Sequence, residues 1–313
     1  MKPGGTPLLA RAQAALPKQA LSLARLARTL TNPRFYPQAP VVKTFWWADE
    51  RNFGDLITPF LLESEGIIPV LKPPAASELV GVGSILELVP QGFEGVVWGS
   101  GKMHGDVETR LPNAHVAAVR GALTRERIDV PGTTALGDPG LLIGDHVHRA
   151  VRGAEGPIGL VVHFSHRSSP WFSDLLEGAE SPVRDIDVRR GPLAVAHDIA
   201  RCRAIVSTSL HGVIVADALG VPAVWALPEP VLAGADFKFL DHESAVNPVG
   251  VDRRVVIGAG ATLSSLSASA WTPERERVAR LNDGLRTALT EAFRARTPDM
   301  MSPLRVPLVQ RRP

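Results

Sequence analysis

The chain has 313 residues, 45% of them hydrophobic and 21% charged, which predicts a globular protein with room for two ordinary domain cores. Its one cysteine, Cys202, excludes an intramolecular disulfide framework and a multi-cysteine zinc site, and favours the reducing cytoplasm. No run of eighteen uninterrupted apolar residues occurs, so no membrane-spanning segment is expected.

The net charge of +2 conceals a basic amino-terminal segment. Seven lysines and arginines precede the first acidic residue, Asp49, which leaves about −5 on the rest of the chain. Within residues 1–40, leucines recur every seven residues from Leu9 to Leu30 and predict a basic amphipathic helical extension, interrupted at Pro17. Two interpretations stay open: a helix packed on its own protein, or a helix that binds peripherally to the anionic cytoplasmic face of the inner membrane. No nucleic-acid partner is expected, and the oligomeric state is left open.

Residues 41–150 are predicted to form a first Rossmann-like domain. Short apolar segments alternate here with polar loops and helical patterns, and they predict strands over residues 41–48, 80–83, 95–99 and 115–119. A helix is expected to begin near Asp55. Such alternation favours a parallel sheet covered by helices on both faces. The polar segment 148–157 is expected to connect this domain to the next.

Residues 151–265 repeat the alternation and predict a second Rossmann-like domain. Strands are expected over residues 158–164, 183–188, 204–206 and 223–225, with helices over 171–178, 192–202 and 212–219. Cys202 ends one of these helices and is interpreted as a packed thiol. Residues 266–313 form a carboxyl-terminal helix, 273–294, and a tail, with the helix placed to pack back across the domains. The fold class is therefore α/β, with two doubly wound domains facing a cleft.

The most informative position is His211, which lies between a short buried strand and a helix that ends at Gly220. Ser207, Thr208 and Ser209 are predicted to supply capping hydroxyls for that helix. A histidine at the carboxyl edge of a parallel sheet lies near free backbone N–H groups, which favour an anion. A purely structural role, as a capping or core histidine, stays open at this point.

Four further ionisable groups follow predicted strands or adjoin buried segments. Asp55 is expected to cap the first helix while facing the sheet edge, and Arg120 ends a strand from which it could clamp an anion. Lys238 lies between two aromatic residues that are expected to be buried, and His163 follows a strand of the second domain. The structural alternatives are a capping aspartate, a surface salt bridge for Arg120 and a satisfied strand end for His163.

Seven short motifs, in this order, resemble the polysaccharide pyruvyl transferase family, in particular the branch that attaches pyruvate ketals to exopolysaccharide sugars. They span roughly residues 41 to 250 and are Asn52-Phe53-Gly54-Asp55, Val82-Gly83-Ser84, Trp98-Gly99-Ser100-Gly101, Val119-Arg120-Gly121 with Thr124-Arg125, Ala135-Leu136-Gly137-Asp138-Pro139, Thr208-Ser209-Leu210-His211-Gly212 and Phe237-Lys238-Phe239-Leu240-Asp241.

The resemblance implies a fold similar to that of B-type glycosyltransferases, phosphoenolpyruvate as donor substrate, and a lipid-linked oligosaccharide as acceptor. Two hydroxyls of one acceptor sugar would form the ketal with release of phosphate, and neither a cofactor nor a metal ion is expected. On this interpretation the site residues are, for catalysis, His211, Asp55, Arg120 and Lys238; for the donor, Arg120, Lys238, Ser209, Gly212 and Arg125; and for the acceptor, Asn52, Asp55 and His163.

One residue departs from the family pattern. Many members carry an arginine two residues before the histidine, where this chain has Ser209, and Arg125 or Arg167 is a candidate to replace that charge. Two other functions are compatible with the same architecture. One is a nucleotide-sugar-dependent glycosyltransferase, for which Asp217 is the candidate ribose ligand. The other is a non-catalytic sugar-binding scaffold of an envelope assembly.

Overall fold

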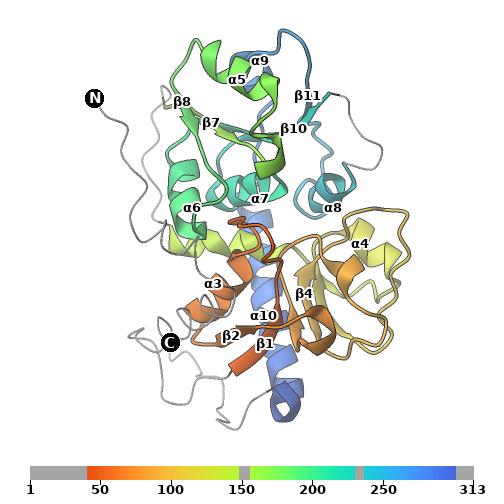
Figure 1. Cartoon of the computed structure of the whole chain (residues 1–313). Helices are drawn as coiled ribbons and strands as arrows, with labels where there is room; N and C mark the ends of the chain where they lie inside the picture. The colour runs from red at the N-terminus through yellow and green to blue at the C-terminus, as the bar shows by residue number, and fades with distance from the viewer. Residues whose placement is uncertain (1–40, 148–155, 230–235, 301–313) are drawn as a thin grey trace.

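Two parallel sheets make up the protein in the computed structural model, which describes residues 41–147, 156–229 and 236–300 (Figure 1). The predicted basic extension of residues 1–40 lies outside the described residues. A six-stranded sheet is built from the first part of the chain, and a five-stranded sheet from the part that follows Pro157. The prediction of an α/β protein with two Rossmann-like sheets is thus confirmed.

The first sheet has the strand order β2-β1-β3-β4-β5-β6, and all its strand pairs are parallel. Its strands are β1 (Val41–Phe45), β2 (Ile68–Leu71), β3 (Leu79–Val80), β4 (Val96–Ser100), β5 (His115–Val119) and β6 (Ala135–Leu136). Helices α3 (Ile57–Ser64) and α4 (Ala122–Arg127) and the 3₁₀ segments η1 (Pro74–Ala76) and η2 (Leu86–Leu88) connect them, and the 3₁₀ segment η3 (Pro139–His146) follows β6. β4 is buried along its whole length, as expected for a central strand covered on both faces.

The second sheet has the strand order β11-β10-β9-β7-β8 and is also parallel throughout. Its strands are β7 (Ile158–Val161), β8 (Val183–Asp185), β9 (Ala204–Ser207), β10 (Ala223–Pro228) and β11 (Arg254–Ile257). The connecting elements are η4 (Phe164–His166), α5 (Pro170–Glu177), α6 (Pro192–Ala200), α7 (Leu210–Leu219), α8 (Phe237–Val246) and α9 (Leu263–Ser267). The thiol of Cys202 is buried, as predicted.

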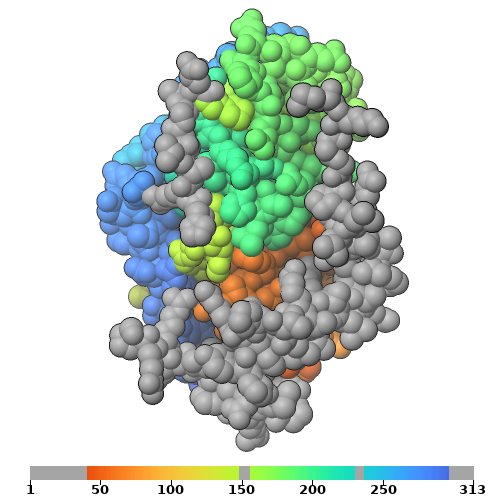
Figure 2. Space-filling view, turned by 90° about the vertical axis from the view of Figure 1, so that its left-hand side faces the viewer, coloured from red at the N-terminus to blue at the C-terminus, as the bar shows by residue number. Residues whose placement is uncertain are grey.

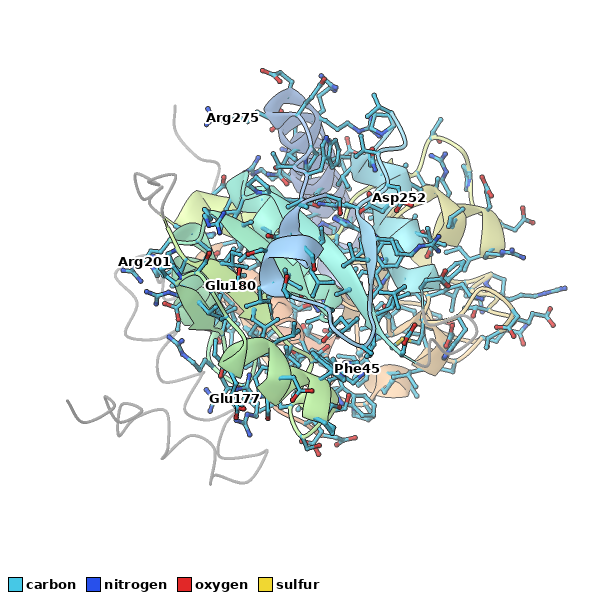
Figure 3. The ribbon with its side chains drawn as sticks, turned by 90° about the horizontal axis from the view of Figure 1, so that it is seen from above. Phe45, Glu177, Glu180, Arg201, Asp252 and Arg275 are labelled. Carbon is cyan, nitrogen blue, oxygen red and sulfur yellow. The ribbon has the colours of Figure 1, made fainter. Side chains whose placement is uncertain are left out.

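The long carboxyl-terminal helix α10 (Arg275–Met300) returns to the first sheet. It packs against β4, β5 and β6 through a stripe that includes Leu281 and Leu285, and the indole N–H of Trp98 donates to the Leu285 carbonyl at 2.9 Å. Its charged outer residues face solvent: Arg275 lies at the periphery in the view from above, as does Arg201 on another side of the molecule (Figure 3). No helix in the described part of the chain is both long and apolar enough to cross a bilayer.

The two sheet units touch at the loops that follow their strands. The backbone N–H of Phe53, after β1, donates to the carbonyl of Val188, after β8, at 2.7 Å. The 3₁₀ segment η3 packs against both α3 and α7, and Figure 2 shows the two units in direct contact on one face. Since the carboxyl ends of parallel strands share one edge of a sheet, these contacts bring the strand-end residues of both sheets together.

Candidate active site

His211 is the second residue of α7, and its ring is buried between the two sheet units. The Phe53 ring lies edge-on to it at 6.3 Å, and Gly54 is so close that a Cβ there would lie 2.0 Å from His211 Nδ1. His211 Nε2 is buried with no hydrogen-bond partner among the described residues. Burial, with the charges of Arg120 and Lys238 adding, lowers the pKa of His211 to about 3, so the imidazole is neutral at physiological pH.

The predicted side-chain capping of α7 is wrong. Ser209 occupies the N-cap position, but no side chain caps the helix. The Ser207 hydroxyl instead accepts from the Ser209 N–H at 3.1 Å, and the Thr208 hydroxyl accepts from the His163 N–H at 2.9 Å. The hydroxyls therefore fix the turn between β9 and α7 to the end of β7, because backbone groups of those segments lie nearer than the orphan N–H groups of the helix.

Asp55 lies at the edge of the first sheet and does not cap α3, which corrects the second capping prediction: Leu56 is the N-cap and no side chain bonds there. The carboxyl group of Asp55 is buried and hydrogen-bonded to Asn52, whose Oδ1 also accepts from the Gly54 N–H at 3.2 Å. Burial raises the pKa of Asp55 to about 7, against the opposing effects of Asn52 and Lys238. Asp55 is therefore poised to exchange a proton near neutral pH.

Lys238, on α8, is the cation that faces Asp55. Burial lowers the pKa of its ammonium group to about 8; the charge of Arg120 lowers it further, and that of Asp55 raises it. Its Nζ lies 5.5 Å from the centre of the Phe239 ring. The prediction that both flanking aromatics are buried holds for Phe239, whereas Phe237 is only half-buried.

Arg120 is fully buried, so the surface salt bridge considered from the sequence is wrong. Its Nε donates to Asp241 at 2.8 Å, one terminal nitrogen to Ser84 at 2.5 Å, and the other to the Lys102 carbonyl at 2.6 Å. Its charge nevertheless reaches the site, since it lowers the pKa of His211 and of Lys238. Arg120 thus contributes a fixed positive charge beside His211 and Lys238.

The remaining predicted site residues differ in where they lie and in whether their side chains are already engaged. Gly212 follows His211 in α7, and a Cβ on it would lie 2.2 Å from the Ser207 hydroxyl. His163 lies at the end of β7, where it precedes η4. The two candidates for a replacement charge are already engaged: Arg125 donates to the Gly132 carbonyl at 2.6 Å, and Arg167 pairs with Asp185.

Asp217, the candidate ribose ligand of the glycosyltransferase interpretation, is buried, and its carboxylate is bonded to neighbouring side chains. Arg253 donates to both of its carboxylate oxygens at 2.7 Å, and His242 Nε2 lies 2.8 Å from one of them. These ion pairs hold the pKa of Asp217 below its usual value despite burial. Because both carboxylate oxygens are already hydrogen-bonded and the side chain is buried, Asp217 is not placed to bind a nucleotide ribose, which removes the residue that favoured that interpretation.

Two acidic residues belong to this region although the sequence motifs that contain them did not single them out. Asp241 accepts hydrogen bonds from Arg120 and from both the N–H and the hydroxyl of Thr124. Asp138, after β6, is buried with one carboxyl oxygen unpartnered among the described residues, and burial raises its pKa to about 6. Among those same residues, no three His, Cys, Asp or Glu side chains are grouped so as to hold a metal ion.

Two parallel sheets with ionisable side chains gathered where their strand ends meet define an α/β protein of the Rossmann-like class. The family model of the polysaccharide pyruvyl transferases matches residues 88–227, which include Arg120, His163 and His211. Asp55 and Lys238 lie outside the matched segment. Together with the similarity to a curated relative described next, this match supports a relationship of the chain to the polysaccharide pyruvyl transferase family, and with it a transferase.

Two curated proteins are similar to the chain. The succinoglycan biosynthesis protein ExoV of Rhizobium meliloti is 25% identical over 242 residues, which cover 74% of this chain and 73% of that protein. An uncharacterized protein of Acanthamoeba polyphaga mimivirus is 31% identical over 131 residues, or 40% of this chain and 43% of that protein. The first alignment extends well beyond the segment that the family model matches.

Proposed function

We propose that the protein transfers the pyruvyl group of phosphoenolpyruvate onto two hydroxyls of one sugar in a lipid-linked exopolysaccharide precursor, forming a pyruvate ketal and releasing phosphate. The observation that carries this proposal is the group His211, Asp55 and Lys238, brought together from both sheet units, in a chain that the pyruvyl transferase family model matches over residues 88–227. The succinoglycan relative supports an exopolysaccharide as the product. The cytoplasmic face of the membrane, where a lipid-linked acceptor is accessible, is the proposed location.

The donor concentrates a phosphate and a carboxylate on three carbons, so its site needs fixed positive charge. Lys238 and Arg120 supply that charge, Lys238 as the group free to contact the donor and Arg120 from behind it. The N-terminus of α7, at Ser209, adds the positive end of the helix dipole, which favours an anion, although the N–H groups of Ser209 and Gly212 already donate to the Ser207 hydroxyl and the Ser209 carbonyl. The donor is then held with its reacting carbons between the two sheet units.

The low pKa of His211 fits a role that begins when the donor binds. In the free protein, burial and two neighbouring cations keep the imidazole neutral. The negative charges of a bound donor offset those cations and raise the pKa of His211, so the ring takes up a proton that it can deliver to the methylene carbon. An acceptor hydroxyl bonds to the adjacent carbon and phosphate leaves, after which the second hydroxyl closes the ketal.

Asp55 is the proposed base for the acceptor hydroxyls. With a pKa near 7, its carboxylate can take a proton from the attacking hydroxyl and release it again within one turnover. Asn52, already hydrogen-bonded to Asp55, orients that carboxylate and stands beside the acceptor. Hydroxyl deprotonation and donor protonation are thereby assigned to different sheet units.

The test is a reaction of the purified protein with phosphoenolpyruvate and lipid-linked oligosaccharide, followed by phosphate release and by mass spectrometry of the glycan. We expect phosphate and ketal to form in equal amounts, and His211→Ala to lower kcat by about 10² to 10⁴. His197→Ala on α6, a half-buried histidine with no role in the site, is the matched control. Glycosyl transfer from a nucleotide sugar, or wild-type phosphate release by His211→Ala, would contradict the proposal.

A further inference from the structure

A pair of histidines at the end of β7 forms a second polar group beside the site. His163 precedes the 3₁₀ turn η4 and His166 ends it, with ring centres 5.7 Å apart. The Phe164 ring lies 4.3 Å from His163, and the Trp171 ring lies 6.1 Å from His166. Both histidines are half-buried, so their rings are held by aromatic neighbours while part of each remains open to solvent.

The hydrogen bonds of this turn engage Nδ1 of both rings and leave Nε2 of each ring available. His163 Nδ1 accepts from the Ser165 N–H and lies 2.7 Å from the Ser165 hydroxyl, so the proton of the neutral ring is on Nε2. The Thr208 hydroxyl accepts from the His163 N–H at 2.9 Å, and its oxygen lies 3.2 Å from His166 Nδ1. When that hydroxyl donates its own proton to His166 Nδ1, the His166 ring, like that of His163, offers an Nε2–H donor.

The charge beside this pair is positive. Burial comes first in lowering the pKa of both rings, to about 4 for His163, and the ammonium group of Lys238 lowers both further. The other ionisable neighbours are His211, whose pKa the His163 ring helps to lower, and the Arg167–Asp185 ion pair, which neutralises itself. Two neutral N–H donors thus lie within electrostatic reach of one cation.

We propose that His163, His166 and Lys238 form a subsite for a phosphate dianion. A phosphate dianion accepts several hydrogen bonds at once, and its negative charge complements the ammonium group of Lys238. A neutral sugar hydroxyl also accepts hydrogen bonds, but it brings no charge. Given the proposed function, this subsite takes the phosphate of phosphoenolpyruvate, which places His163 on the donor side instead of the acceptor side expected from the sequence. Phosphate binding itself does not depend on that function.

Isothermal titration calorimetry of the full chain with inorganic phosphate tests the subsite. Replacing His163 and His166 together by alanine removes both donors and is expected to weaken phosphate binding by about tenfold or more. Replacing both by glutamine keeps an amide N–H near the position of Nε2 and should hold the affinity within about threefold of wild type. His197→Gln is the control and should leave the affinity unchanged.

Two further ligands separate the sources of the phosphate group. Phosphoenolpyruvate should compete with inorganic phosphate and should lose affinity in the double alanine variant to a similar degree. A short alkyl diphosphate, which mimics the lipid link of the acceptor, should not compete. Competition by the diphosphate alone would assign the subsite to the acceptor lipid and overturn its assignment to the donor.

The possible failures are distinguishable. Unchanged phosphate affinity in a folded double alanine variant, with its thermal unfolding midpoint as the check on folding, overturns the subsite even if wild-type protein transfers pyruvate. Phosphate binding that depends on the two histidines, in a protein that does not use phosphoenolpyruvate, would uphold the subsite and overturn the proposed function. Glutamine variants that bind as weakly as alanine variants would likewise overturn the role given to the Nε2–H donors.

Discussion

At the scale of single residues, Asp55 and Lys238 form a proton-exchanging pair with neighbouring pKa values of about 7 and about 8. The proposed reaction requires Asp55 ionised and Lys238 protonated, so activity needs a pH above the first value and below the second. We predict a bell-shaped dependence of kcat/KM on pH with its maximum between about 7 and 8, measured by phosphate release. Lys238→Arg should move the alkaline limb upward; an alkaline limb that stays in place would contradict the assignment.

The raised pKa of Asp55 also leads to a prediction about the stability of the folded protein. Because the pKa of Asp55 is raised in the folded state, the folded protein binds a proton that the unfolded chain has lost between pH 3.8 and about 7. The contribution of Asp55 to stability therefore declines as pH rises through that range. Asp55→Asn removes this decline, and relative to wild type the variant should gain on the order of 2 to 4 kcal/mol between pH 4 and pH 8.

Urea denaturation at the two pH values measures this difference. Asp174→Asn on α5, an exposed residue, is the matched control and should show the same pH dependence as wild type. A flat difference between Asp55→Asn and wild type would show that burial does not perturb this carboxyl. If Asp55→Asn is more stable than wild type at pH 8 but inactive, Asp55 serves the reaction and destabilises the fold.

At the scale of elements, the contact between the loop after β1 and helix α7 depends on residue 54 being glycine, which has no side chain. A Cβ on Gly54 would lie 2.0 Å from His211 Nδ1 and 2.3 Å from Cγ, so Gly54→Ala must displace the loop or the imidazole. We predict a loss of transfer activity of about 10² or more, since small misplacements of a reacting group are costly. Gly92→Ala, where a Cβ meets nothing within 4 Å, is the control and should retain activity. Comparable activity in both variants would contradict the predicted contact.

The elements also show where sequence reasoning succeeded and failed. Buried strands such as β4 and β9 were predictable because continuous apolar, β-branched runs identify them. The two-residue strand β6 and the polar helix α8 carry no such periodicity and were missed. The capping roles were predicted from residue type alone, whereas the Ser207 hydroxyl donates to the Val161 carbonyl at the end of β7 and the Thr208 hydroxyl accepts from the His163 N–H just after that strand.

The candidate site, too, was predictable from the sequence in part. Asp55 and Arg120 could be placed together because the parallel strands of the first sheet end at one edge, and His211 could be placed at the corresponding edge of the second sheet. The burial of Arg120 against Asp241 could not be predicted, since it joins residues 121 positions apart through a helix without a sequence signal. For the same reason the sequence could not show that Asp217 is occupied by Arg253.

At the scale of the whole molecule, α8 is joined by polar contacts to both sheet units. Toward the first sheet, Asp241 binds Arg120, and the Ser244 hydroxyl accepts from the Ala122 N–H at 2.8 Å. Toward the second, His242 lies against Asp217 on α7, the helix that carries His211. Lys238 stands on the first turn of the same helix, so its position is coupled to the packing of the two units.

This coupling makes the Arg120–Asp241 pair more consequential than a surface ion pair. Asp241→Ala would leave the guanidinium of Arg120 buried without its counter-charge, and we predict a loss of about 3 to 5 kcal/mol in the free energy of unfolding. Glu108→Ala breaks the exposed Glu108–Arg110 pair and should cost less than about 1 kcal/mol. Urea denaturation of both variants measures these costs.

Activity of the same variant under conditions that keep it folded separates stability from positioning. If α8 sets the place of Lys238, folded Asp241→Ala should show a KM for phosphoenolpyruvate raised by about tenfold, because the donor loses its aligned cation. Asp241→Asn keeps oxygen and nitrogen where the carboxylate stood and should recover part of that loss. An unaltered KM in folded Asp241→Ala would show that Lys238 is held by α8's contacts with the second sheet alone.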